Sequence, residues 1–273
     1  MKLIHSLNED KPVVGMTTLN NELYVRRQTF PYNEEDNDDI ITIYDTETFC
    51  SVQRSLQIPR LGSVNDMTSC NRHQCIYISD SKNKVVHRVE NKNIITQWPV
   101  DDEPNGLSVN SVHNVLVTCD LVGKIKEFTT DGKLVREIQL HADIVNPSHT
   151  FELITDQFVV CHGDNDDPVH RVCIVNSNGC ILQSYGGSKG SGSRQLNLPV
   201  RISVNGYIFV ADLNNDRVLM LGPNLTYSRI VVSGLRKPLR LWFDEQTGRL
   251  YIADNKRENR KYVSGNVKVY VVD

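Results

Sequence analysis

Residues 206–221, with the sequence GYIFVADLNNDRVLML, hold two short apolar runs separated by a polar turn. Both runs are rich in aromatic and branched aliphatic residues, a composition typical of strands. Asp212 begins the turn, and an Asp side chain can accept hydrogen bonds from the backbone amides that follow it. Asn215 is expected to take the left-handed conformation that such a turn needs. The stretch therefore predicts a tight β-hairpin.

The strand phrase IFVAD of this hairpin recurs along the chain. Its copies are LYIAD at 250–254, IYISD at 76–80 and the looser ELYVRR at 22–27, VLVTCD at 115–120 and QFVVCH at 157–162. Successive copies are 40 to 53 residues apart, which brackets the roughly 40–50 residues of a four-stranded propeller blade. In five of the six units a Pro stands before the preceding apolar strand, where no ladder N–H is needed.

Each of the first five units divides into four short strands, and no stretch has an apolar stripe at helical spacing. The sequence therefore predicts an all-β fold, a six-bladed β-propeller of four-stranded antiparallel blades that forms one domain over 1–273. The blades are expected at 11–59, 60–102, 103–145, 146–197, 198–236 and 237–273. The last unit has only three strands, so the N-terminal strand at 2–8 (KLIHSLN) is predicted to close it as the outermost strand.

The Pro-entry strand, the hairpin YIFVADLNNDRVLML and the Gly-rich loop YGGSKGSGSRQLNLP at 185–199 together resemble NHL repeats. The resemblance implies a six-bladed propeller like the NHL module of tripartite-motif proteins, many of which bind RNA or protein. The chain has no RING, B-box, coiled-coil or filamin-like segment, so the resemblance implies no ubiquitin-ligase activity. No blade has the GH…WD pair that marks WD40 repeats.

Composition limits the classes of partner. The net charge of −3 gives no general attraction for polyanions, and no apolar run approaches the roughly 20 residues that span a bilayer. We expect a cytoplasmic protein with no membrane partner, because the N-terminal residues contain no apolar signal region. The sequon Asn224-Leu225-Thr226 leaves a secreted protein open. The odd number of cysteines and the absence of CxxC predict reduced, buried thiols. They are Cys50, Cys70, Cys75, Cys119, Cys161, Cys173 and Cys180.

Two stretches invite a metal-binding or phosphate-binding interpretation, but we predict no metal, cofactor or catalytic site. The stretch CNRHQC at 70–75 offers Cys70, His73 and Cys75, but no fourth ligand is visible and the spacing matches no familiar zinc motif. The Gly-rich loop lacks a Gly-Lys-Ser/Thr ending and leads into a strand. Neither GxSxG nor HExxH occurs, so we expect no enzyme. A propeller hydrolase or lyase, with acids and histidines gathered at the channel, stays open as a further alternative.

The candidate binding residues lie at one mouth of the central channel. The inner strand of each blade begins there, and the turns between second and third strands emerge on the same side, which we call the channel face. His149, Arg201 and Arg240 stand at the starts of inner strands, Asp66 occupies the matching place in the second blade, and Arg27 ends the second strand of the first. We predict Arg27, His149, Arg201 and Arg240 as binding residues.

Charged turns surround these residues. EEDNDD at 34–39 and GDNDD at 163–167 are expected in blades on opposite sides of the ring, and NKRENRKYVSG at 255–265 is predicted to be a basic loop. The pattern favours a protein or peptide partner with a central anionic group, because an RNA backbone would be repelled by the acidic turns. The turns could equally be ordinary solvated loops. The predicted function is a monomeric, non-catalytic interaction scaffold, with single-stranded RNA binding through Arg201 and Arg240 as the alternative.

Overall fold

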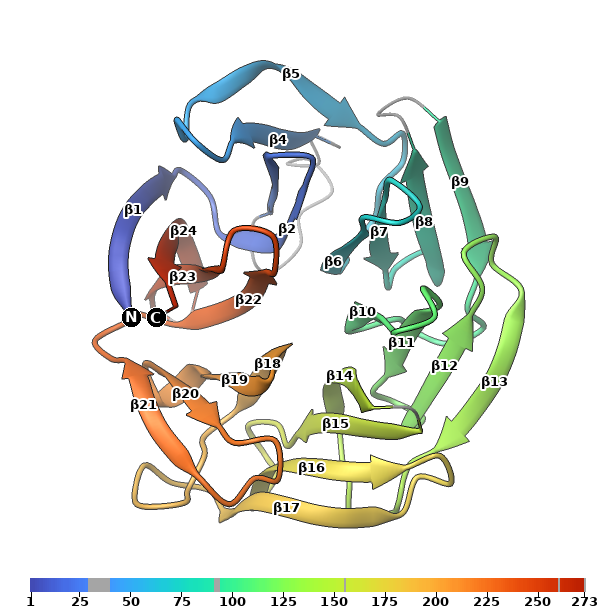
Figure 1. Ribbon diagram of the computed structural model, residues 1–273, viewed down its shortest axis with the longest axis vertical. Helices are drawn as coiled ribbons and strands as arrows, with labels where there is room; N and C mark the ends of the chain where they lie inside the picture. The colour runs from blue at the N-terminus through green and yellow to red at the C-terminus, as the bar shows by residue number, and fades with distance from the viewer. Residues whose placement is uncertain (29–39, 91–93, 155, 260, 273) are drawn as a thin grey trace.

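The computed structural model describes residues 1–28, 40–90, 94–154, 156–259 and 261–272. These residues form six four-stranded antiparallel sheets arranged around a central axis (Figure 1). The prediction of an all-β six-bladed propeller is confirmed. Among the described residues, no helix is long and apolar enough to cross a membrane.

Five blades are each built from four consecutive strands, ordered from the axis outward. The first contains β2 (Val13–Leu19), β3 (Glu22–Arg27), β4 (Ile40–Asp45) and β5 (Ser51–Gln57), and the second β6 (Val64–Cys70), β7 (Cys75–Asp80), β8 (Val85–Glu90) and β9 (Ile94–Pro99). The third contains β10 (Leu107–Val109), β11 (Val115–Cys119), β12 (Lys124–Phe128) and β13 (Leu134–Gln139). The fourth contains β14 (Pro147–Ile154), β15 (Gln157–His162), β16 (Val169–Asn176) and β17 (Ile181–Ser188). The fifth contains β18 (Pro199–Asn205), β19 (Tyr207–Asp212), β20 (Arg217–Leu221) and β21 (Ser228–Val232).

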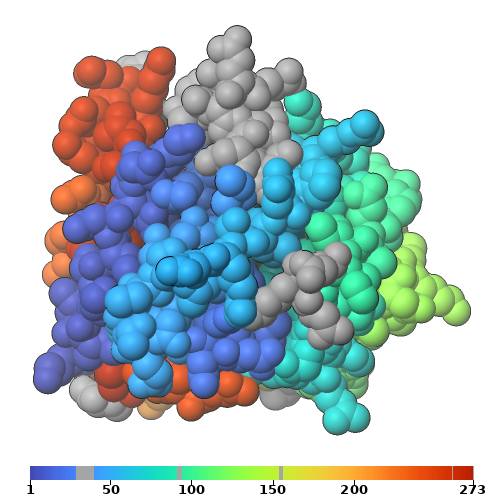
Figure 2. All heavy atoms as spheres, turned by 90° about the horizontal axis from the view of Figure 1, so that it is seen from above, coloured from blue at the N-terminus to red at the C-terminus, as the bar shows by residue number. Residues whose placement is uncertain are grey.

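The sixth blade joins the two ends of the chain. Its inner strands are β22 (Pro238–Asp244), β23 (Arg249–Glu258) and β24 (Lys261–Val271), and β1 (Lys2–Glu9) is its outermost strand. Lys2 pairs with Val271 and Glu9 with Gly265, so β1 and β24 are antiparallel and the marked termini lie side by side in Figure 1. In the perpendicular view, the first-blade residues lie next to the orange-red C-terminal strands (Figure 2). The predicted closure is confirmed.

The core lies between neighbouring blades. Tyr24 of the first blade packs in one apolar cluster with Ile76 and Ile78 of the second, and Val159 of the fourth packs with Val210 of the fifth. The middle strands are apolar on both faces because each face is covered by another blade. This explains why the repeats read as nearly continuous apolar runs. Burial of apolar surface stabilises the ring by about 25 cal/mol per Å².

The opening hairpin forms as β19 and β20, but its turn differs in detail from the prediction. Residues Leu213–Asn215 make a 3₁₀ turn, and the left-handed residue is Asp216 (φ 54°) instead of Asn215. The Asp212 carboxylate accepts hydrogen bonds from Asn215 Nδ2 and Arg217 Nε, both at 2.7 Å. Because Asn215 is held by Asp212 inside the 3₁₀ turn, the chain reverses one residue later.

The Asp that recurs at this position of the repeat also binds the loop before the inner strand. Asp212 also accepts a 2.7 Å hydrogen bond from the backbone N–H of Asn197, which lies in the loop that leads into β18. Asp80 accepts from the N–H of Gly62 at 2.8 Å in the same way, and also from the following amide of Asn83 at 3.1 Å. Each carboxylate therefore fastens its hairpin to the entry of the inner strand, which positions the residues at the channel.

The prediction of a basic loop at 255–265 is wrong. Pairing between β23 and β24 continues through Asn255 and Gly265 to Glu258 and Lys261, so residues 255–259 and 261–265 extend this hairpin instead of forming a basic loop. Arg257 lies opposite Tyr262, with its guanidinium carbon 5.6 Å from the ring centroid, a cross-strand contact that favours continued pairing. The segment at 163–167 does connect β15 to β16, and the predicted acidic turn at 34–39 lies outside the described residues.

Candidate functional site

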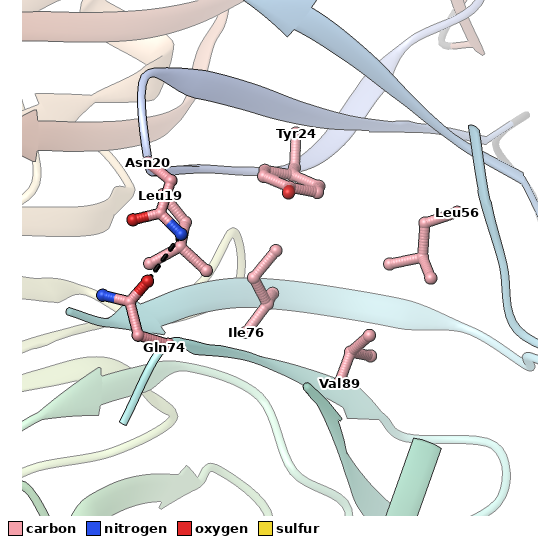
Figure 3. Close-up of a pocket in the computed structure, with 7 residues that line it drawn as sticks. All are labelled: Leu19, Asn20, Tyr24, Leu56, Gln74, Ile76 and Val89. Atoms are coloured by element: carbon pink, nitrogen blue, oxygen red, sulfur yellow. Dashed lines mark hydrogen bonds between the residues drawn. The ribbon is translucent and has the colours of Figure 1, made fainter. Parts of the chain in front are cut away.

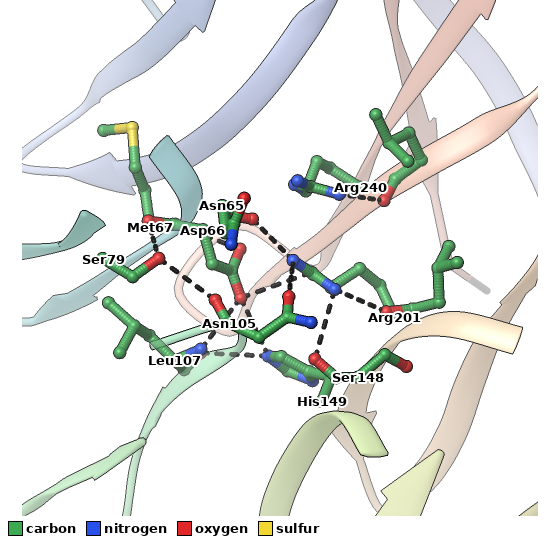
Figure 4. Close-up of polar contacts among 12 residues, drawn as sticks. Asn65, Asp66, Met67, Ser79, Asn105, Leu107, Ser148, His149, Arg201 and Arg240 are labelled. Atoms are coloured by element: carbon green, nitrogen blue, oxygen red, sulfur yellow. Dashed lines mark hydrogen bonds and ion pairs between the residues drawn. The ribbon is translucent and has the colours of Figure 1, made fainter. Parts of the chain in front are cut away.

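The start of the inner strand has the same irregularity in five blades. The pairing register shifts there, and the residue after the shift is Gly15, Asp66, His149, Arg201 or Arg240. A bulge of this kind re-aims the side chain that follows it. In the third blade Asn105 precedes β10 and donates its N–H to the Thr118 carbonyl. The polar side chains of this set converge on the channel from separate blades, as Figure 4 shows.

Asp66 is the centre of this cluster (Figure 4). Its Oδ2 lies 3.2 Å from His149 Nε2 and 3.4 Å from Arg201 Nε, and it accepts a 3.0 Å hydrogen bond from the N–H of Leu107. Burial alone would raise the pKa of Asp66, but Arg201 and His149 oppose that effect and hold the pKa well below its ordinary 3.8. Asp66 is therefore a carboxylate at every physiological pH.

Arg201 joins four blades. Its Nη1 donates to the carbonyl oxygens of Val200 at 2.7 Å and Ser148 at 3.3 Å. Its Nη2 donates to the carbonyl oxygen of Asn65 at 2.5 Å and to Oδ1 of Asn105 at 3.3 Å. With 3% of its surface exposed, Arg201 is a buried cross-channel link.

Arg240 is also buried, but its partners are carbonyl groups. Its Nε donates to Val14 O at 2.6 Å and its Nη1 to Leu239 O at 2.9 Å. Burial and the nearby Arg201 lower the pKa of Arg240 to about 9. Among the described residues it forms no direct ion pair with a carboxylate. In the described part of the chain, the cluster thus holds two guanidinium groups against the single carboxylate of Asp66.

His149 has one paired and one unpaired ring nitrogen. Its Nε2 lies 3.0 Å from Leu107 O and 3.2 Å from Asp66 Oδ2; both are acceptors, so Nε2 carries the hydrogen. Its Nδ1 is buried and has no hydrogen-bond partner in the described part of the chain. The Nδ1 lone pair therefore has the capacity to accept one more hydrogen bond.

Arg27 does not join this cluster through any direct contact between described residues. Its Nη1 pairs with Asp10 Oδ1 at 2.7 Å, and its Nη2 donates to Thr42 Oγ1 at 3.1 Å. The other three predicted residues do come together, at 3–6% exposure instead of on an open rim. Sequence reasoning did not single out Asn105, although its place just after the Pro of its repeat is a usable signal.

Two other possible sites, an apolar pocket and a metal site, have less support. A pocket of about 200 Å³ between the first and second blades is lined mainly by apolar side chains, and Asn20 donates to Gln74 across its edge at 2.6 Å (Figure 3). None of the described residues that line it is charged. Within the described ranges, no three His, Cys, Asp or Glu side chains are placed to hold a metal ion. Five of the free cysteines are buried, whereas Cys50 and Cys180 are exposed.

Comparison with known proteins establishes the architecture. No family model and no curated protein matches the sequence. A protein of unknown function from Bacteroides caccae is 20% identical, with a TM-score of 0.60 over 81% of each chain. Catalytically inactive virginiamycin B lyase from Staphylococcus aureus, solved with quinupristin, is 13% identical, with a TM-score of 0.64 over 99% of each chain.

A chain of the nidogen/laminin complex is 13% identical, with a TM-score of 0.61 over 80% of this chain and 79% of that one. The similar structures thus include both a lyase and a protein complex. At these identities the likeness defines the protein as a six-bladed β-propeller and goes no further. The relation to NHL repeats stays a prediction.

Proposed function

We propose that this propeller is a non-catalytic interaction scaffold that binds a protein or peptide through the channel face. The observation that carries the proposal is the excess of buried positive charge among the described residues, two guanidinium groups against the carboxylate of Asp66. A buried charge without a counter-charge is costly, and a carboxylate or phosphate group near Arg240 would offset that cost. The partner accordingly presents an anionic group to the channel.

The acidic turn of the fourth blade favours a protein over RNA. Asp164 and Asp167 both accept hydrogen bonds from Asn146 Nδ2, at 3.2 and 3.1 Å, so their carboxylates are held in a fixed turn between β15 and β16. A polyanionic backbone crossing this face would be repelled by the turn. A peptide can place one anionic group at the centre and neutral or basic residues over the turn.

The test is a binding screen with arrayed acidic, neutral and basic 12-residue peptides and a single-stranded RNA of equal length. We expect the wild type to select acidic peptides, Arg240→Gln to weaken binding at least about tenfold, and Arg240→Lys to retain most of it. Arg229→Gln, an exposed residue of the fifth blade, is the matched control. Selection of the RNA with a steep salt dependence, or equal binding by Arg240→Gln, would contradict the proposal.

One observation favours an enzyme as the second candidate. Asp66 fixes the Nε2–H tautomer of His149 and leaves Nδ1 as a base, the arrangement of a general-base dyad. Arg201 and Arg240 would then stabilise an anion that forms on a substrate. This candidate is tested by a screen for hydrolysis of esters and lactones and for elimination reactions. Turnover that is abolished by His149→Ala would favour a hydrolase or lyase over the scaffold.

A further inference from the structure

We propose a second binding site, at the mouth of the channel opposite the channel face, for an organic cation of the ammonium or guanidinium class. A cavity of about 670 Å³ opens there, where the inner strands end. All six blades contribute to it, from Thr18 in the first to Glu245 in the sixth. Its size is within the roughly 300–1,000 Å³ of small-molecule sites. The proposal does not depend on the function proposed above.

The charges around this cavity select the sign of the ligand. Among the described residues that line it, the acids are Glu152, Asp244 and Glu245, Arg72 is the one Lys or Arg, and His113 is the one histidine. Ser111 donates to Glu152 through Oγ at 2.7 Å. Thr247 donates to Asp244 in the same way at 2.9 Å. These neutral donors leave the negative charges uncompensated, and none of the four charged residues forms an ion pair with another described residue. The cavity therefore attracts cations.

Aromatic side chains provide the second element of the site. Phe151 of β14 and Trp242 of β22 occupy equivalent positions in their blades, opposite Val159 and Tyr251 of the adjacent strands. They line the cavity on either side of Ser203, which β18 contributes from the blade between them. An aromatic face attracts an ammonium or guanidinium group through its quadrupole.

The indole ring is held in place by its own hydrogen bond. Trp242 Nε1 donates to Thr18 Oγ1 at 2.8 Å, which links the sixth blade to the first. A fixed aromatic side chain beside acidic residues loses little conformational entropy on binding a cation. The carbonyl and hydroxyl acceptors of the inner-strand ends can take the N–H donors of the ligand. A free amine or a Lys or Arg side chain of a peptide would supply this chemistry.

Tryptophan fluorescence tests the site directly. The protein has two tryptophans, and Trp98 is buried among the blades, so the Trp98→Phe variant reports on Trp242 alone. This variant is titrated with 1,5-diaminopentane, with the capped peptide Gly-Gly-Lys-Gly-Gly, and with the dianion glutarate. We expect a saturable change with the amine or the peptide and none with glutarate. Whichever of the two cationic ligands binds more tightly identifies the source of the cationic group, a free amine or a peptide side chain.

Charge variants decide whether the acids make the site. Glu245→Gln combined with Glu152→Gln should weaken cation binding by about tenfold, whereas Glu103→Gln, an exposed acid outside the cavity, should leave it unchanged. Calorimetric titration of the wild type repeats the measurement if Trp98→Phe folds poorly. The absence of saturable cation binding up to about 10 mM, equal affinity in the double variant, or a glutarate response would overturn the proposal.

Discussion

His149 Nε2 lies 3.2 Å from Asp66 Oδ2, and this contact joins the inner strand of the fourth blade to that of the second across the channel. Both residues are 5% exposed. Arg201 of the fifth blade binds the same carboxylate oxygen. The N–H of Leu107 in the third blade also binds this oxygen, so four blades share one buried carboxylate. We therefore expect the stability of the ring to depend on its charge.

Replacing Asp66 with Asn should lower the free energy of unfolding by about 3 kcal/mol at pH 7, because Arg201 would be left buried without its counter-charge. The folded-state pKa of Asp66 lies below its ordinary 3.8, so its contribution is complete above that pH and declines as the pH falls below it. Urea unfolding at pH 7 and pH 3 should show the gap between the variant and the wild type narrowing on acidification.

The exposed Asp101→Asn change is the control for Asp66. It should leave the unfolding free energy within about 0.5 kcal/mol of the wild type at both pH values. A gap for Asp66→Asn that widens in acid would show that the carboxylate is not held ionised by its partners.

His162, at the end of β15, should make the protein less stable in mild acid. Burial and the charge of Arg171 lower the pKa of His162 from 6.5 to about 4, so the folded state holds it neutral. Unfolded chains take up the proton as the pH falls below 6.5, and stability is lost between that pH and about 4. Unfolding midpoints at pH 7, 5.5 and 4.5 should fall less steeply for His162→Gln, while His141→Gln, half exposed, keeps the wild-type slope.

The contribution of Asp212 to stability is expected to depend more on the shape of its side chain than on its charge. Asp212→Ala removes the acceptor for Asn197, Asn215 and Arg217 and should cost about 2–4 kcal/mol in chemical denaturation. Burial raises the pKa of Asp212, so an uncharged side chain of the same shape avoids part of the desolvation cost. Asp212→Asn should therefore be clearly less destabilising than Asp212→Ala, and the reverse order would contradict this account.

Removal of residues 1–10 should lower the melting temperature by about 10 °C or more. The deletion takes away β1, exposes the edge of β24, and removes the 2.8 Å hydrogen bond from Tyr44 to Glu9. Differential scanning calorimetry measures the change, with the exposed Lys2→Ala as control. An unchanged melting temperature would mean that the ring does not depend on this strand.

The blades could be predicted because their signals are local. Each repeat carries its own Pro, apolar runs and turn, and the missing fourth strand of the last unit indicated the closure. The extended β23–β24 hairpin was missed because its residues are polar, whereas packing between Arg257 and Tyr262 across the strands favours pairing.

The interior of the channel was predictable only in part. The starts of the inner strands pointed to His149, Arg201 and Arg240, but burial depth depends on how six blades meet at the axis. The bond from Arg201 to Asn65 O joins residues of the second and fifth blades, and no local pattern records such a contact. The same limit applies to the opposite cavity, whose lining comes from every blade.

The pairing of Lys2 with Val271 also determines how the ring responds to force. Because the two termini leave the sixth blade at neighbouring points, tension applied between them would load the β1–β24 bonds one after another, from Lys2 toward Glu9. Such unzipping needs much less force than shearing all the bonds at once. The propeller would then open between β1 and β24 while the other five blades remain folded.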